Sequence, residues 1–539
     1  MMRRRFLTLV LCLPFLLAAG CRRAGNDVAR GNHDGILLLG NGAEPTDLDP
    51  HVITGTKEFA ISTALFEGLA SVDPVDSRPT PGVAESWDVS PDGLTYTFHL
   101  RADARWSNGD PVTAQDFLWS WQRVLTPALA SEFCFYLFDI RGAADFNAGK
   151  TKDFAAVGLR APDARTFVVT LEHPTPYFLN LLRAPPFFPV HRASVEAAGP
   201  ADKRGTGWTK AGRLVGNGPF ALAEWTVNKV VDTRKNPHYW DRARVRLNGV
   251  KFFPWDNLEN EERAFRAGQL HRTYGVPFSK IDAYKRDHPD TLRLDPYART
   301  QYLALNVRRA PLDDVRVRRA LGMAIDREAI VRNITRGGEL AAYALNPPDL
   351  GGVYTARARL PYDPAAARAL LAEAGHPGGK DLPPVELLFN TSEANRVIAE
   401  AVQQMWKAEL GVDATLRNEE WKVYLARRTR QDYLSYEGGW TTFYLDPTGF
   451  LELFVGGSII NQTGWANATY DRSLAEAART LDPAARAELL QRAEGALVDE
   501  APILPLYHHV RAYLLSPAVQ GWLPNRIDDH PYKYVWLKE

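Results

Sequence analysis

The chain has 539 residues, of which 45% are hydrophobic, and its 64 basic side chains equal its 64 acidic side chains in number. This length and apolar content predict two or three lobes, each with a core of its own. The even charge balance excludes a basic footprint for nucleic acid, so no nucleic acid is expected among the partners.

The first twenty residues follow the pattern of an export signal. A basic head of Arg3, Arg4 and Arg5 precedes an apolar run over 6–17. Because a membrane-spanning helix needs about 20 apolar residues, this shorter run predicts a signal peptide over 1–20.

Cys21 follows the sequence LAAG at 17–20, which is the pattern of a bacterial lipobox. We expect Cys21 to be acylated as the first residue of the mature chain. The protein would then be exported and held by its lipid at the periplasmic or cell-envelope face of a membrane. An ordinary signal peptide followed by an incidental cysteine is the alternative. Cys134 is the one other cysteine of the mature chain, so no internal disulfide is expected.

The mature chain is predicted to begin with a flexible tether over 22–34, since this segment is polar and contains glycine. A buried strand over 36–39 is expected to end in a turn at Gly40, and alternation over 94–100 indicates a half-buried strand. Thr113 is expected to cap a helix that continues to about Val124. Strands and helices therefore intermix in this part of the chain.

Farther along, strands are expected over 166–171, 220–231 and 385–389. Helices are expected from Asp314 to about Ile325, where one apolar stripe faces a core, from Asp363 to a stop at Gly375, and over 398–410. The alternation of strands and helices between about 295 and 510 indicates an α/β lobe.

Nine short motifs, spread over nearly the whole mature chain, resemble those of the family 5 extracellular solute-binding proteins, in particular the oligopeptide-binding branch. Each motif alone could arise by chance, but their order and spacing together are specific. They are NGAEP at 41–45, LDPH at 48–51, LFEGL at 65–69, GVAESW at 82–87, WSNGDPVTAQDF at 106–117, NGPF at 217–220, NPHYW at 236–240, DVRVR at 314–318 and AIDR at 324–327.

The resemblance implies an α/β, two-lobed periplasmic-binding-protein fold with an accessory domain and a ligand cleft between the lobes. Lobe one would combine residues 35–66, 193–294 and 511–539, the accessory domain would be 67–192, and lobe two would be 295–510. Ligand would be enclosed by hinge closure. Most of the motifs are expected to be structural, with Trp106, Trp119, Trp121 and Trp240 as core aromatics.

The resemblance also implies a function. A lipid-anchored monomer would capture peptides, oligopeptides above all, and pass them to the permease of an ABC importer without a cofactor or a metal. Binding of a murein peptide, a blocked peptide or a nonpeptide solute is the alternative within transport. A surface receptor or chaperone that uses the same cleft is the alternative outside transport.

Two segments lie where the family holds the ligand main chain. A peptide of any sequence can be held by pairing with exposed strand segments, because all peptides share the same backbone groups. Gly55 and Gly439 would allow close approach of backbones, and Trp421 and Trp440 would form walls of side-chain pockets. The two segments are Thr54, Gly55 and Thr56, and Gly439, Trp440, Thr441, Thr442 and Phe443. Strand ends that are merely marked by glycine are the alternative interpretation.

The charges of the predicted site depart from the family. The aspartate that usually meets the α-ammonium of the ligand falls on Phe443 here. Glu437 stands where close relatives carry arginine, six residues and about 20 Å earlier along a strand. Glu437 could receive an ammonium or a basic side chain elsewhere in the cleft, and Arg428 could meet a carboxylate. Glu437, Asp446 and Arg428 could equally be solvated or paired surface charges.

An enzyme is not expected from this sequence. It contains no metal-binding His-Glu-x-x-His, no nucleophile elbow, no Gly-rich phosphate loop and no clustered Cys/His ligands. His508 and His509 are adjacent on a predicted strand, so their rings point to opposite faces and do not share a metal easily.

Overall fold

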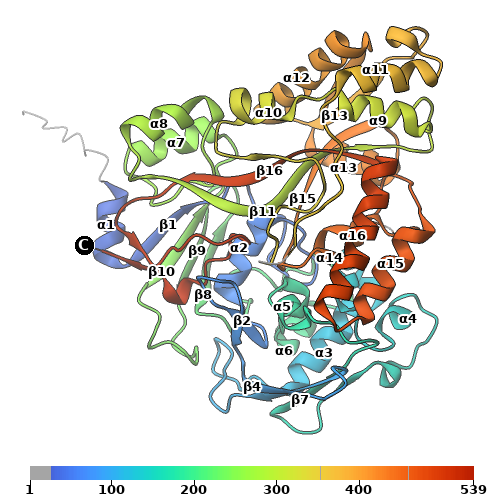
Figure 1. Cartoon of the computed structure of the whole chain (residues 1–539). Helices are drawn as coiled ribbons and strands as arrows, with labels where there is room; N and C mark the ends of the chain where they lie inside the picture. The colour runs from blue at the N-terminus through green and yellow to red at the C-terminus, as the bar shows by residue number, and fades with distance from the viewer. Residues whose placement is uncertain (1–25, 352–353, 459, 539) are drawn as a thin grey trace, which may run out of the picture.

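The computed structural model describes residues 26–351, 354–458 and 460–538, and most of its strands lie in three sheets (Figure 1). The predicted signal peptide and Cys21 lie outside the described residues. Two further sheets are two-stranded ribbons, formed by β2 (Ala70–Val72) with β3 (Pro79–Pro81) and by β17 (Val519–Gln520) with β18 (Trp536–Leu537).

The first sheet combines the start of the described chain with a segment two hundred residues later. β1 pairs in parallel with β10, and antiparallel pairing continues through β9 to β8. The strand predicted at 36–39 is confirmed, and its Leu37 and Leu39 are at most 2% exposed. The strands of this sheet are β1 (Ile36–Gly40), β8 (Phe220–Thr226), β9 (Val230–Lys235) and β10 (Gly249–Phe253).

The single strand predicted over 220–231 is wrong, because this segment is a hairpin of β8 and β9. Asn228, between the two strands, adopts a left-handed φ of 58°. Asparagine is among the few residues that adopt this conformation readily, so the chain reverses there.

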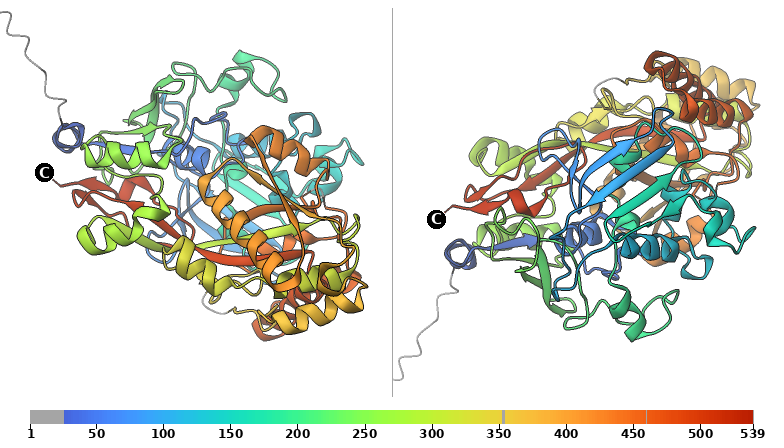
Figure 2. Two further views of the ribbon diagram at one scale, coloured as in Figure 1. Left: turned by 90° about the horizontal axis from the view of Figure 1, so that it is seen from above. Right: turned by 90° about the horizontal axis from the view of Figure 1, so that it is seen from below.

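The second sheet has the order β4-β5-β7-β6 and packs against α3 (Figure 2). The cap predicted at Thr113 is confirmed at the start of α3, where Thr113 and Asp116 form a capping box with the Thr113 amide donating to Asp116 Oδ2 over 2.7 Å. Trp121 of α3 meets Phe167 of β7 edge to face at 5.0 Å. The elements are β4 (Ala84–Val89), β5 (Thr95–Leu100), α3 (Ala114–Leu125), β6 (Leu159–Arg160) and β7 (Thr166–Thr170).

The third sheet has six strands in the order β12-β16-β11-β15-β13-β14. Helices α9, α11 and α12 share an apolar core with one of its faces, and α14, α15 and α16 share a core with the other. Its strands are β11 (Leu292–Leu305), β12 (Leu340–Ala341), β13 (Val385–Asn390), β14 (Ala414–Glu419), β15 (Ser435–Thr441) and β16 (Ile503–Leu514). The covering helices are α9 (Val315–Met323), α11 (Pro364–Glu373), α12 (Glu393–Leu410), α14 (Thr448–Leu451), α15 (Ala468–Arg479) and α16 (Pro483–Glu500).

The predicted strand at 385–389 and the helices predicted near 314–325, 363–375 and 398–410 are confirmed as β13, α9, α11 and α12. The remaining helices are α1 (Asp27–Asp34), α2 (Thr56–Leu65), α4 (Ala143–Asn147), α5 (Phe178–Leu181), α6 (Arg192–Ala198), α7 (Leu258–Arg266), α8 (Ile281–Asp287), α10 (Arg327–Ile330) and α13 (Trp421–Thr429).

β11 and β16 form a long antiparallel pair that crosses the molecule (Figures 1 and 2). The pair runs from Leu292 opposite Leu514 to Ala304 opposite Ile503, with two register shifts on the way. These strands pass through the predicted lobe boundaries near residues 295 and 510. With those boundaries, β11 and β16 would connect the two predicted lobes.

The flexible tether predicted over 22–34 is wrong for its described part, because residues 27–34 form α1. The Asn26 side chain caps this helix at Ala29, and Gly35 ends it with a φ of 68°. Asn32 of α1 also bonds to His271 across 239 positions of sequence, with Oδ1 2.9 Å from Nε2. These contacts hold the segment against the first sheet.

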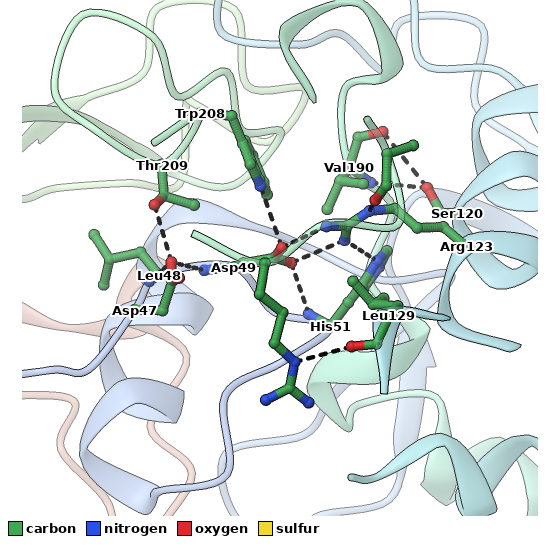
Figure 3. A network of polar contacts seen from close by, with 12 residues as sticks. Asp47, Leu48, Asp49, His51, Ser120, Arg123, Leu129, Val190, Trp208 and Thr209 are labelled. Atoms are coloured by element: carbon green, nitrogen blue, oxygen red, sulfur yellow. Dashed lines mark hydrogen bonds and ion pairs between the residues drawn. The ribbon is translucent and has the colours of Figure 1, made fainter. Parts of the chain in front are cut away.

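A buried ion pair joins the segment after β1 to α3 (Figure 3). Arg123 donates from both terminal nitrogens to the Asp49 carboxylate, at 2.7 and 3.1 Å, and Trp208 donates to the same carboxylate at 3.2 Å. Burial alone would raise the pKa of Asp49, but Arg123 brings it below its usual value. Loss of one partner of such a pair costs about 3–5 kcal/mol, so this contact fixes the second sheet to the first.

The four tryptophans predicted as core residues are all at least partly buried. Trp106 and Trp121 are at most 1% exposed, and Trp119 and Trp240 pack as half-buried rings against a neighbouring core.

Candidate functional site

A cavity of about 50 Å³ lies between the end of β1, α2, the end of β15 and the C-terminal segment after β16. Of the residues predicted for the site, Thr56, Thr441, Thr442 and Phe443 line it. This volume holds only a few water-sized groups.

Thr54, Gly55 and Thr56 pair with no strand among the described residues, so pairing of this segment with a peptide stays a prediction. Gly55 has extended dihedral angles, φ −99° and ψ 147°, and is the residue before α2, which begins at Thr56. A Cβ at position 55 would lie 2.1 Å from Glu58 Oε2. Glycine is therefore required for Glu58 to reach back to the Thr46 amide at 3.0 Å.

β15 offers an incompletely paired edge. On one side it pairs with β11 along its whole length, from Ser435 to Thr441. On the other side β13 pairs only with Ser435 and Tyr436. Beyond Tyr436, no strand among the described residues pairs with that edge, so main-chain groups of the predicted segment are available to an added strand.

The side chains on one face of the third sheet change from apolar to polar along its length. Leu303 of β11 faces the core beneath α9 and α12, whereas Gln301 and Arg299, at the next positions on that face, are polar. Opposite these three residues on β15 stand Glu437, Gly439 and Thr441. The face thus leaves the core and becomes polar where it approaches the cavity.

The polar side chains of this face form one network. Arg299 lies 3.2 Å from both Thr441 Oγ1 and His509 Nε2. Gln301 donates to Glu437 Oε1 at 3.0 Å. A Cβ at Gly439 would lie 2.5 Å from Gln301 Oε1 and 2.6 Å from an Arg299 nitrogen, so only glycine leaves room for the network.

Burial raises the pKa of Glu437 to about 8, although Gln301 and Arg299 act in the opposite direction. The interpretation of Glu437 as a solvated surface charge is wrong, because the side chain is 1% exposed. Asp446 is a paired charge, with Arg486 donating to both of its oxygens at 2.8 Å.

Arg428, Trp421 and Trp440 are not brought to the cavity. Arg428 donates to Gln462 Oε1 at 2.9 Å, and its guanidinium lies 4.4 Å from the centre of the Tyr436 ring. Among the described residues, no carboxylate forms an ion pair with Arg428. Trp421 is 51% exposed, and the Trp440 indole donates to the Gly449 carbonyl. These three residues lie around α13 and α14 instead.

Phe443 lies in an aromatic cluster that joins three parts of the chain. Its ring is 5.5 Å from Phe59 of α2, 5.8 Å from Phe133 and 5.7 Å from Tyr136. Its carbonyl accepts a hydrogen bond from Arg183. The position that would carry an amine-binding carboxylate is therefore occupied by an apolar contact.

The two acids that line the cavity are already paired. Asp528 accepts from Arg511 at 2.8 Å, and Asp529 accepts from Arg183 at 2.7 and 2.9 Å. Burial alone would raise the pKa of Asp528, but Arg511 brings it well below its usual range. Sequence reasoning missed these residues, and the adjacent acids at 528 and 529 were the one signal that could have indicated them.

A second contact across the molecule is centred on Glu452, directly after α14. Tyr177, near α5, donates to Glu452 Oε1 at 3.0 Å, and Tyr444 donates to Oε2 at 3.2 Å. The two tyrosine rings stack at 4.9 Å. Burial, with the neighbouring Asp139 adding to it, raises the pKa of Glu452 to about 8. We call Tyr177, Tyr444 and Glu452 the tyrosine clasp.

Within the described ranges, no group of three or more His, Cys, Asp or Glu side chains is arranged to hold a metal ion. None of the helices in this part of the chain is long and apolar enough to cross a membrane.

The tyrosine clasp predicts a pH-dependent stability. Because the pKa of Glu452 is higher in the folded protein than in the unfolded chain, its stabilising effect is complete below about pH 4.5 and is lost as the pH rises through about 8. Glu452→Gln keeps a neutral side chain at every pH. The free energy of unfolding from urea titrations should therefore fall less with rising pH in this variant than in wild type.

Glu488→Gln is the matched control, since Glu488 is an exposed acid paired with Arg357. It should leave the pH dependence of wild type unchanged. An equal loss of stability with rising pH in wild type and Glu452→Gln would contradict the raised pKa of Glu452.

Residues 78–462 match the family described as "Bacterial extracellular solute-binding proteins, family 5 Middle". The chain is 38% identical over 500 residues to the periplasmic oligopeptide-binding protein OppA of Salmonella typhimurium, covering 90% of this chain and 89% of that protein. The structure of Haemophilus influenzae OppA in complex with the peptide RPPGFSPFR matches with a TM-score of 0.84 at 32% identity, covering 94% of this chain and 99% of that one.

Two structures of the murein tripeptide binding protein MppA are also similar. The Escherichia coli protein matches with a TM-score of 0.86 at 34% identity, covering 93% of this chain and 98% of that one. An unliganded open form of MppA matches with a TM-score of 0.71 at the same 34% identity, covering 94% of this chain and 97% of that one. The difference at equal identity means that the parts of this chain are arranged differently from those of the open form.

Proposed function

The chain belongs to the bacterial extracellular solute-binding proteins of family 5, and on that premise we propose that it captures peptides, oligopeptides above all, between its two lobes for delivery to the permease of an ABC importer. Its structural neighbours are two-lobed α/β binding proteins, and members of this family are carriers rather than enzymes. The predictions of family and fold class are thus confirmed.

The incompletely paired edge of β15 is the observation that carries the proposal. A peptide added along this edge would bond through main-chain groups that every peptide has. The extended Gly55 stands across the cavity, where Thr56 and Thr441 both line the wall. Recognition of the main chain accounts for capture of peptides without a fixed sequence. No specific observation favours a receptor, chaperone or nonpeptide carrier.

The ligand-binding residues remain the predicted set, with unequal support. Thr56, Thr441, Thr442 and Phe443 line the cavity, and Gly439 and Glu437 continue from it along the polar face. Thr54 and Gly55 stand at the approach to α2. Trp421, Arg428 and Trp440 lie around α13 and α14, so they would contact only a ligand that extends from the cavity to these helices.

Closure of the cleft around a peptide should stabilise the protein. Binding at a peptide concentration about a hundred times Kd adds about 2.7 kcal/mol to the free energy of unfolding. The ligand released from purified protein, identified by mass spectrometry, supplies the peptide to use. Melting and small-angle scattering should then show a higher Tm and a smaller radius with ligand. A saturating peptide that alters neither would contradict the proposal.

Phe443 predicts that a free N-terminus adds little to affinity. In calorimetry, an N-acetylated peptide should bind wild type about as well as its free form, whereas an amine-dependent site would lose about 3–5 kcal/mol on acetylation. Phe443→Asp should restore a preference for the free amine. A large loss on acetylation in wild type that persists in Glu437→Gln would mean that another acid holds the amine.

The lipid anchor is also part of the proposal, and the lipobox pattern before Cys21 supports it. We infer export by the signal peptide, acylation of Cys21 and retention of a monomer at the membrane face. Cys21→Ser should leave the protein unprocessed or in the soluble fraction, with peptide binding unchanged. Membrane fractionation of the variant with normal lipid labelling would exclude Cys21 as the acylated residue.

A further inference from the structure

Glu437 is a buried acid with one oxygen left unbonded. Its Oε1 accepts from Gln301, but Oε2 has no hydrogen-bond partner among the described residues, although the side chain is 1% exposed. A buried polar group without a partner costs about 1–3 kcal/mol, and a charged one costs more. A donor supplied by a ligand would remove that cost.

The neighbouring groups direct their hydrogen bonds elsewhere. Arg299 donates to Thr441 and, at 3.3 Å, to Gln301 Oε1, and His509 Nε2 lies 3.1 Å from the same Gln301 oxygen. The Tyr424 hydroxyl donates to the main-chain oxygen of Glu437 at 2.6 Å, not to its carboxyl group.

Tyr507, with Glu339 near it, is the other titratable neighbour of Glu437, and burial raises the pKa of Tyr507 well above its usual range. Burial lowers the pKa of His509 well below its ordinary value, with Arg299 acting in the same direction, so His509 is neutral at physiological pH. Among the described residues, Arg299 is the cation whose charge acts on Glu437. Its hydrogen bonds go to other groups.

The position of Glu437 suits a side chain of a bound peptide. Glu437 and Thr441 are four residues apart on one face of β15, which corresponds to about 13 Å. The side chains of Gln301 and Arg299 fill the space above Gly439, which lies between them. A side chain of a peptide held at the cavity would therefore reach the unbonded oxygen by displacing these two side chains.

We propose that Glu437 recognises a cationic side chain of the ligand, an ammonium or a guanidinium, so that the carrier prefers peptides containing lysine or arginine. This inference rests on the proposed function as a peptide carrier. Charge-assisted hydrogen bonds are about twice as strong as neutral ones, and a buried carboxylate is tolerated when it is paired. A ligand carbonyl, the competing partner, would need Glu437 as a neutral donor.

Binding of a cationic side chain should also release a proton from Glu437, and this release can be measured. With a pKa of about 8, Glu437 holds a proton at neutral pH before ligand binds. An arriving cation favours the ionised carboxylate, so the proton is released as the ion pair forms. A neutral peptide has no such effect.

The test uses alanine tripeptides that carry one lysine at each position in turn, with norleucine at the same position as the uncharged counterpart. Calorimetry compares wild type with Glu437→Gln, which retains an amide donor and acceptor but cannot pair with a cation. Glu494→Gln is the matched control, because Glu494 is a buried acid whose oxygens already accept from Asn346 and Tyr354.

At least one lysine peptide should bind wild type about tenfold more tightly than its norleucine counterpart, and Glu437→Gln should reduce that advantage to about threefold or less. Glu494→Gln should preserve it. Measurements in two buffers of different ionisation enthalpy should show proton release with that lysine peptide and none with norleucine. The proton-release measurement uses only the wild-type protein, so it tests the inference even if Glu437→Gln does not fold.

Equal binding of lysine and norleucine peptides at every position would overturn the inference, as would a lysine preference that survives Glu437→Gln. Absence of binding by all the peptides would contradict the proposed function itself, so the two failures are distinguishable.

Discussion

The antiparallel pairing of β11 with β16 is the interaction on which the site depends. The pair continues from the core beneath α9 and α12 to the cavity, with two register shifts on the way, so its main-chain hydrogen bonds connect the two. Leu303 is buried in the core, and Arg299, four positions earlier on β11, stands in the polar network. β15 takes its register from β11, and the positions of Glu437, Gly439 and Thr441 follow from it.

Local signals predicted most of the regular elements. Thr113 and Asp116 form the cap that the sequence indicated for α3, and α11 ends just before Gly375, whose φ is 94°. The ends of these helices can be predicted from sequence because capping and left-handed turns depend on a few consecutive residues. The resemblance of ordered motifs added the family and the fold class, which local patterns alone do not give.

The errors arose where distant contacts decide the structure. Residues 27–34 are polar and resemble a tether, but His271 and a good cap hold them as α1. For the site, the paired state of Asp528 could not be predicted, because Arg511 is brought to it only by the fold.

The tyrosine clasp joins two segments that are far apart in the sequence. Tyr177 stands just before α5, and Glu452 follows α14. Because Tyr177 donates to Glu452 at 3.0 Å, these two segments cannot move apart without breaking this hydrogen bond. The clasp thus restrains the motion of α5 relative to α14.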